Sequence, residues 1–244
     1  MILSNCEAII PPNCSAVVPP KSCKNFPSDI LKWMKANAKP LMALKLMQVC
    51  EYFQHENFQF ELIKGLSKKE GGSWNYSTTE NAFCAASTID NIHHNKFLFI
   101  TQYLYLYQRI DPFSSFLSKV AVYQAKSLHF DFQNITFNEF KILTAAGTIE
   151  TTKIRNTKIT DANDKNKLAA FEKILECLPK VKELHFGEIV PSFVSPRQAA
   201  EVNVPKLRYL ELQNIDDDFN HELFTWFKQN HPFIHCFISF SIQK

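Results

Sequence analysis

The segment Phe130-Asp-Phe132-Gln-Asn-Ile135 is closely echoed by Leu210-Glu-Leu212-Gln-Asn-Ile215. In both segments two apolar residues flank one acidic residue and precede a Gln-Asn pair. Alternation of apolar and polar residues indicates a strand with one buried face. The echo therefore predicts that the second half of the chain repeats one structural unit.

Three further segments carry a comparable pattern, which places equivalent strand positions at Phe130/Phe132, Thr152/Ile154, Leu184/Phe186, Leu210/Leu212 and Cys236/Ile238. The second members are spaced by 22, 32, 26 and 26 residues, and Leu104-Tyr-Leu106 ends 26 residues before Phe132. Helical spacing predicts helices over 137–146, 161–178 and 218–230. Strand followed by helix is the expected unit.

This pattern resembles a divergent leucine-rich repeat, Leu-any-any-Leu-any-Leu-any-any-Asn followed by a helix. Leu207, Leu210 and Leu212 fit it best. The asparagine site is the main departure, because we expect it to hold Ile135, Thr157, Ile189 and Ile215. Stacked units of this kind share a continuous core that no single unit could form. The alternative is an unrelated α/β domain with coincidental spacing.

Strand alternation also predicts which side chains face solvent. The inward set is Phe130, Phe132, Ile154, Leu184, Phe186, Leu210 and Leu212. The outward set, our candidates for binding a target protein, is Asp131, Lys153, Arg155, His185, Tyr209, Glu211 and Gln213. A strand face that is merely solvated is an equally weighted alternative.

Residues 26 to 53 predict a compact helical module. Pro27 suits a helix start and Asp29 places a carboxylate near the positive end of the helix dipole. Ile30, Leu31 and Met34 follow at helical spacing. Pro40 then opens a second apolar run, so two short helices meeting at a proline are expected, and an ordinary helical hairpin is the alternative.

This module resembles an F-box, with Phe26-Pro27 at the Leu-Pro positions and Asp29 at the acidic one. The resemblance implies docking to a Skp-type adaptor, and through it to a cullin. The adaptor-binding residues that it implies are Phe26, Pro27, Ile30, Leu31, Met34, Val49, Cys50 and Phe53.

Composition names no partner class. The formal net charge is only +3, which does not suggest a nucleic-acid partner. The seven cysteines lack Cys-any-any-Cys spacing, so neither a disulfide framework nor a zinc site is expected. No signal peptide or membrane span is apparent, and we expect an intracellular protein, cytoplasmic or nuclear.

Four regions are expected: a mobile leader at 1–24, the F-box-like module at 25–66, a connecting region at 67–97 and the repeats at 98–244. A helix is expected near 80–92, within the connecting region. The predicted fold class is α/β, a small helical F-box-like module followed by an irregular leucine-rich-repeat-like solenoid of strands and helices.

Catalytic, cofactor and metal motifs are not found in the sequence. The five glycines form no phosphate loop, the His93-His94 pair lacks partners at metal-ligand spacing, and Asp216 to Asp218 are expected to cap a helix. Trp33 and Trp226 stand at core spacing. The favoured hypothesis is a non-enzymatic substrate receptor of an SCF-type ubiquitin ligase, which binds an unknown target protein. A stand-alone repeat scaffold and an enzyme whose residues gather only in the fold are the alternatives.

Overall fold

The structure, a computed structural model, describes residues 26–38, 42, 46, 51–54, 60–69, 71–78, 83–86, 97–164, 166–215 and 219–240. The chain forms two compact units, Met1–Gln59 and Phe60–Lys244. The expected leader at 1–24 lies outside the described residues, as do Val49, Cys50, the His93-His94 pair and Asp216 to Asp218.

The first unit contains the helix α1 (Ser28–Asn37) and the 3-10 helix η3 (Glu51–Gln54). Pro27 stands at the N-cap of α1 and Asp29 lies in its first turn, so the predicted helix start is confirmed within one residue. Leu31 and Phe53 are each only 2% exposed, and the rings of Tyr52 and Phe53 meet edge to face at 5.2 Å.

The second unit is built mainly of strands. These are β1 (Phe60–Lys68), β2 (Trp74–Thr78), β3 (Phe83–Ala86), β4 (Phe97–Leu106), β5 (Val120–Tyr123), β6 (Ser127–Asp131), β7 (Asn134–Thr136), β8 (Thr151–Arg155), β9 (Lys158–Thr160), β10 (Glu183–Gly187), β11 (Tyr209–Ile215) and β12 (His235–Phe240). Its helices are α3 (Phe113–Leu117), α4 (Phe137–Thr144), α5 (Phe171–Glu176), α6 (Pro196–Glu201) and α7 (His221–Asn230).

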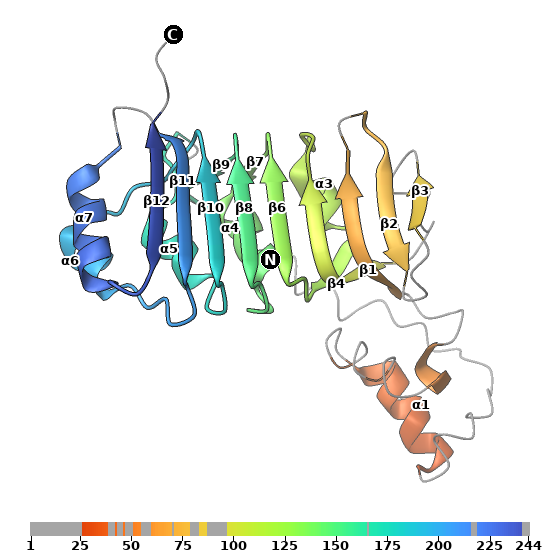
Figure 1. Cartoon of the computed structure of the whole chain (residues 1–244). Helices are drawn as coiled ribbons and strands as arrows, with labels where there is room; N and C mark the ends of the chain where they lie inside the picture. The colour runs from red at the N-terminus through yellow and green to blue at the C-terminus, as the bar shows by residue number, and fades with distance from the viewer. Residues whose placement is uncertain are drawn as a thin grey trace. The chain divides into compact units, whose positions relative to one another are not determined.

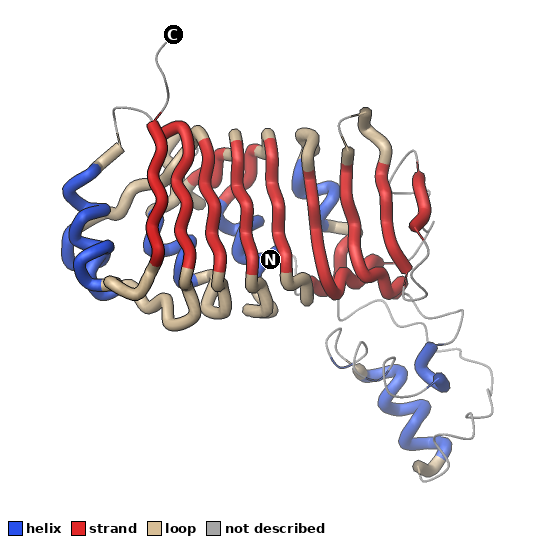
Figure 2. Tube along the Cα trace, viewed as in Figure 1, coloured by secondary structure: helices blue, strands red, loops and turns tan. Residues whose placement is uncertain are grey.

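One large sheet organises this unit (Figures 1 and 2). Nine strands run in the order β12-β11-β10-β8-β6-β4-β1-β2-β3, and β5 pairs with β4 as well. Neighbours from β12 to β1 are parallel, whereas β1, β2 and β3 pair antiparallel. Strands β7 and β9 form a separate parallel pair. The predicted α/β class, with strands and helices following one another along the chain, is confirmed at this level.

The sheet begins earlier than the sequence suggested. Strand β1 pairs in parallel with β4, so residues 60–66 belong to the sheet and not to the helical module. Strands β2 and β3 extend the same sheet through the expected connecting region. The helix expected near 80–92 is wrong where the structure describes it, because Phe83–Ala86 forms β3 and pairs with β2. Strand pairing outweighs the local helical pattern there.

The register of the first repeat corrects the predicted alignment. Phe130 pairs with Ile154, so the inward residues of β6 are Leu128 and Phe130, and not Phe130 and Phe132. Phe132 is 53% exposed and lies in the turn after β6, with a φ of 56°. The corrected spacing between Leu106, Phe130, Ile154, Phe186, Leu212 and Ile238 is 24, 24, 32, 26 and 26 residues.

The turn after each strand repeats the same backbone conformation. Positive φ values of 56°, 44°, 64° and 51° occur at equivalent positions, two residues beyond the second inward residue of four successive strands: Phe132, Asn156, Glu188 and Asn214. Asn tolerates this left-handed region, whereas Phe and Glu are strained in it. A shared conformation at unlike residues indicates that the repeat, and not the local sequence, fixes the turn.

The residue after this turn occupies the position that corresponds to the asparagine of the repeat pattern. From the sequence we expected Ile135, Thr157, Ile189 and Ile215 there. In the first repeat the occupant is Gln133, while Ile135 lies in β7. Gln133 is fully buried, and its Nε2 donates to the carbonyl oxygens of Gln108 and Asp131, each at 2.7 Å. Its Oε1 accepts from the backbone N–H of Ile110 at 3.0 Å. A buried amide thus ties two neighbouring turns together.

The helices confirm the predicted pattern only partly. Helix α4 begins at a capping box, in which Thr136 Oγ1 accepts from the backbone N–H of Glu139 and the Glu139 carboxylate accepts from that of Thr136. The helix expected over 161–178 is reduced to α5, because β9 and a loop precede it. Helix α6 was not predicted, although Ser195 followed by Pro196 is a start signal. Figure 1 shows α4 and α5 behind the sheet.

Candidate protein-interaction face

The outward positions of the parallel strands form one surface, which we call the strand face. It faces the viewer in Figure 1, and no described helix of the second unit crosses it. By register it comprises Tyr103, Tyr105, Ser127, His129, Asp131, Thr151, Lys153, Arg155, Glu183, His185, Gly187, Tyr209, Glu211, Gln213, His235 and Phe237. All seven outward residues predicted from the sequence lie on it.

The inward side confirms the same alternation. Phe130, Ile154, Leu184, Phe186, Leu210 and Leu212 are at most 2% exposed. Phe132 is the one predicted inward residue that is not buried, for the register reason given above. One side of the sheet packs into the core, which fixes the register of the strands. The strand face, on the other side, is directed toward solvent.

Unlike side chains meet along the middle of the strand face. One row across neighbouring strands contains Tyr105, His129, Lys153, His185, Glu211 and Phe237. The rings of Tyr105 and His129 stack at a centroid distance of 4.1 Å and an angle of 13°. Phe237 ends the row and is 48% exposed. The row offers aromatic area, which protein interfaces favour, together with the charged side chains of Lys153 and Glu211.

His129 is the most perturbed group of the strand face. Its pKa falls from 6.5 to about 4, chiefly because burial disfavours the imidazolium, and further because Lys153, His185 and Arg155 lie close. The ring is therefore neutral at pH 7. It acts as a half-buried aromatic surface beside Tyr105 and not as a cation.

Glu211 collects hydrogen bonds from its neighbours. Its Oε2 lies 2.5 Å from His185 Nδ1, and its Oε1 accepts from Gln213 Nε2 at 2.6 Å. Burial alone would raise the pKa of Glu211, but the hydrogen bonds from His185 and Gln213 outweigh it and lower the pKa overall. The pKa of Tyr209 is raised, first by desolvation and then by the Glu211 charge. These hydrogen bonds hold the His185, Glu211 and Gln213 side chains in one arrangement.

Lys153 and Arg155 are the two cations of the strand face, as the sequence predicted. Within the described parts of the chain, neither lies within ion-pair distance of a carboxylate. Gly187 stands beside Arg155, and a Cβ there would meet Arg155 Cγ at 3.4 Å. The glycine leaves room for the arginine stem to lie across β10. Both heads remain available to a partner.

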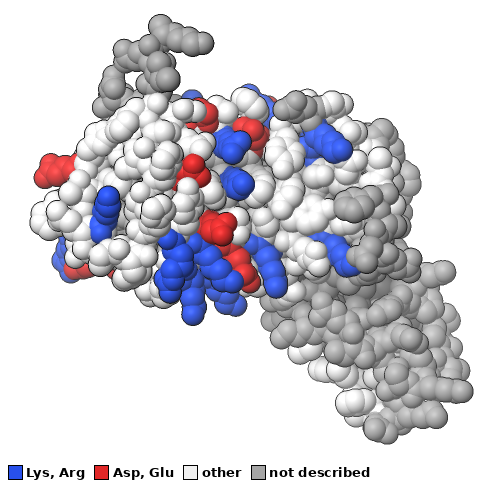
Figure 3. All heavy atoms as spheres, viewed as in Figure 1, with Lys and Arg blue, Asp and Glu red and all other residues white. Residues whose placement is uncertain are grey.

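Tyr103, on β4, lies at the end of the strand face opposite β12. The Tyr103 ring lies over Gly65, where an added Cβ would come within 1.9 Å of the ring, and its hydroxyl is 3.2 Å from Ser77 Oγ. Only glycine admits the ring in this position. Charges of both signs are interspersed among uncharged side chains on the strand face (Figure 3).

Sequence reasoning missed the tyrosines of β4 and the histidines of β6 and β12. A signal for the tyrosines was present, because Tyr103, Tyr105 and Tyr107 alternate with Leu104 and Leu106. His129 escaped notice because the repeat was aligned two residues late, so its strand was taken to start after it.

The first unit presents a different kind of surface. Ile30 and Trp33 on α1, and Phe26 just before its N-cap, recur at helical spacing and are 47%, 66% and 55% exposed. We call these three residues the α1 stripe. Trp33 is therefore not a core residue, contrary to expectation, and neither is Trp226, at 44%. Of the other adaptor candidates, Pro27 is exposed, Met34 is half-buried, and Leu31 and Phe53 are buried.

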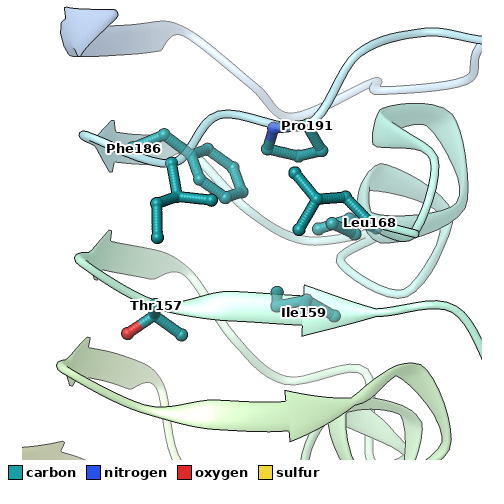
Figure 4. A pocket seen from close by; sticks show the side chains of 7 residues that line it. Thr157, Ile159, Leu168, Phe186 and Pro191 are labelled. Carbon is teal, nitrogen blue, oxygen red and sulfur yellow. The ribbon is translucent and has the colours of Figure 1, made fainter. Parts of the chain in front are cut away.

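A small apolar crevice lies behind the sheet (Figure 4). Its walls are Thr157, Ile159, Leu168, Ile174, Phe186, Ile189 and Pro191, and it encloses about 10 Å³. That is space for about one water molecule and too little for a substrate. In the described residues, no group of three or more His, Cys, Asp or Glu side chains is placed to hold a metal ion. No described helix combines the length and apolarity that crossing a bilayer requires.

No protein-family model matches the chain, and no curated protein matches it significantly. The two surfaces themselves, the strand face and the α1 stripe, are what bears on function.

Proposed function

We propose that the protein is a substrate receptor of an SCF-type ubiquitin ligase. In this proposal the first unit docks a Skp-type adaptor, which links it to a cullin, and the strand face binds the target protein. The protein carries no active site of its own and uses no cofactor. The second unit is then an irregular leucine-rich-repeat solenoid, and the first is an F-box.

The α1 stripe is the observation that carries the proposal. Two large apolar side chains on α1 and a third just before its N-cap are exposed, and the burial of such a stripe by a partner would be favourable by about 25 cal/mol per Å² of apolar surface. Helix faces with anchors at this spacing bind in apolar grooves of a partner. The stripe falls within the residues that resemble an F-box.

The strand face supports the second half of the proposal. It combines stacked aromatic rings, the Glu211 cluster and two cations, Lys153 and Arg155, which have no carboxylate at ion-pair distance among the described residues. A preorganised surface loses little conformational entropy on binding. Binding of a folded protein or a peptide therefore suits it better than chemistry does.

A stand-alone scaffold is the second candidate, and the strand face favours it equally. The two candidates differ only in the role of the first unit. In a scaffold without ubiquitin machinery, α1 binds no adaptor.

Adaptor binding by the full chain tests the proposal. Ile30 is 47% exposed, so Ile30→Lys should leave the fold intact, unlike a charge at the buried Leu31. We expect Ile30→Lys to weaken binding of a purified Skp-type adaptor about 30-fold or more, as for an apolar anchor at an interface centre.

The matched control is Ala36→Lys, which adds the same charge to the same helix at an exposed position outside the stripe. It should change binding by less than about threefold. Equal binding by wild type and Ile30→Lys, or no adaptor binding by the wild type, would overturn the adaptor role and favour the scaffold.

A further inference from the structure

Basic side chains gather where the parallel strands begin. Figure 3 shows Lys and Arg concentrated along the lower border of the sheet, below the strand face. We call this border the basic edge and define it by its five exposed cations: Lys126, Lys180, Lys182, Lys206 and Arg208. They lie in the loops that precede β6, β10 and β11.

Backbone hydrogen bonds align these loops. The N–H of Glu150 donates to the Lys126 carbonyl at 2.7 Å, and that of Lys182 donates to the Glu150 carbonyl at 2.7 Å. The N–H of Arg208 continues the row to the Lys182 carbonyl at 2.9 Å. Neighbouring strands lie about 4.8 Å apart, so the row from Lys126 to Arg208 extends over about 14 Å. The repeat thus converts residues distant in sequence into a line of charge.

Two of these repeats carry the same basic signature. Pro179-Lys180-Val181-Lys182 and Pro205-Lys206-Leu207-Arg208 occupy the same place before β10 and β11. Arg208 is held in position, because its Nη1 donates to the carbonyl oxygens of Leu207 and Pro205 and its guanidinium lies 5.8 Å from the Phe233 ring centre. The cations therefore project from a fixed backbone and not from a loose tail.

The acids nearby only partly offset these cations. Glu150 lies 2.5 Å from Lys182 Nζ, and Glu183 is exposed at the start of β10. The Glu150 pKa is lowered, first by the hydrogen bond from Lys182 and further by the charges of Lys126 and Lys180. Five cations against two acids leave an excess of three positive charges, equal to the formal net charge of the whole chain.

We infer that the basic edge binds an acidic segment of a partner protein, a stretch rich in Asp, Glu or phosphorylated residues. Charge complementarity of this kind steers association and sets its salt dependence. A nucleic acid fits less well, because the chain's pI of about 8.4 is below that of typical nucleic-acid-binding domains and Glu150 interrupts the row. The inference rests on the proposed function, since it names the chemistry of the target.

The test uses the full chain and a fluorescein-labelled oligoglutamate peptide, followed by fluorescence anisotropy. We expect binding that weakens about tenfold or more between about 50 and about 200 mM NaCl. Lys180→Glu combined with Lys206→Glu should weaken it about tenfold or more at the lower salt concentration. Both positions are exposed and have no ion pair among the described residues, so the fold should be retained.

The matched control is Lys158→Glu combined with Lys167→Glu, which makes the same change in net charge at exposed positions in and after β9, outside both the basic edge and the strand face. It should change the affinity by less than about threefold. Oligouridine RNA and vesicles containing phosphatidylserine are tested in parallel, and both should bind more weakly than the peptide.

Equal losses in the edge variant and the control would overturn the inference, because net charge alone would then explain binding. Unchanged peptide binding by the edge variant would overturn it too, as would tighter edge-dependent binding of the RNA or the vesicles. None of these readouts involves the adaptor, so failure here is distinguishable from failure of the proposed adaptor role.

Discussion

Single residues of the second unit have two kinds of role: some stabilise the turns, and others form the strand face. Gln133 and Thr157 satisfy buried backbone groups in consecutive turns, and Gln133 N donates to Thr157 Oγ1 at 3.1 Å. His129 instead stays neutral between an aromatic ring and two cations. Hydrogen bonds of this type connect the turns of neighbouring repeats, whereas the His129 ring forms part of the strand face.

Gln133→Leu should lower the free energy of unfolding by about 3 kcal/mol, because several buried carbonyl and N–H groups would lose their partner without access to water. Urea unfolding followed by circular dichroism measures this. Gln213→Leu, on the strand face, is the control and should cost less than about 1 kcal/mol. A loss at Gln133 no larger than at Gln213 would show that its hydrogen bonds do not stabilise the turns.

The depressed pKa of His129 predicts how stability changes with pH. Between pH 6.5 and about 4 the unfolded chain binds a proton at His129 that the folded chain does not. Its contribution to stability is therefore complete above pH 6.5 and is lost as the pH falls toward 4. His129→Gln should reduce the slope of unfolding free energy against pH in this window. A ring that titrates near 6.5 in the folded protein, as measured by NMR, would contradict the prediction.

At the scale of elements, the shared left-handed turn is the feature that repeats most faithfully. Four successive units place a non-glycine residue there, and only two of these residues are Asn. The energetic cost is local, and the gain is a common direction for the chain after each strand. A residue persists in this strained conformation only where the surrounding structure determines it.

Phe132→Asn should raise the free energy of unfolding by about 0.5–1 kcal/mol, since Asn tolerates the left-handed region and the Phe132 ring is largely exposed. Phe132→Val should lower it by about 1 kcal/mol or more, because a β-branched residue fits that region worst. Thermal unfolding of the two variants beside the wild type measures both. Shifts of the same sign in both would show that backbone strain does not decide stability here.

The elements show how far a sequence pattern can lead. Alternation placed the seven outward residues correctly, and it did so even where the repeat was misaligned. A slip of two residues preserves the face on which each side chain lies, so Phe130 stayed inward and Asp131 outward. The slip arose because the similar segments 130–135 and 210–215 stand two residues apart relative to the turn: the structural equivalent of Phe132 is Asn214 and not Leu212.

Other elements could not be predicted from local pattern. Strand β3 owes its conformation to pairing with β2, and the role of Gln133 depends on carbonyl groups about two dozen residues away. The His185–Glu211 contact likewise joins two strands at a register that only the folded sheet establishes. Long-range pairing determines these features, so a reading of local periodicity misses them.

At the scale of the whole molecule, we propose that the two units have separate roles. The first offers an exposed apolar stripe on α1, and the second offers an open strand face with a basic edge along one border. These surfaces differ in chemistry, which allows one protein to hold two unlike partners. Repeat arrays suit the second task because their extended surface is built from small, similar units.

The adaptor complex tests the central claim most directly. The full chain is mixed with an excess of a purified Skp-type adaptor, and size-exclusion chromatography with light scattering gives the mass of the product. We predict a one-to-one complex with a mass equal to the 28.2 kDa chain plus one adaptor. Ile30→Lys should abolish this complex and Ala36→Lys should preserve it. Separate elution of the 28.2 kDa chain and the adaptor at micromolar concentrations would contradict it.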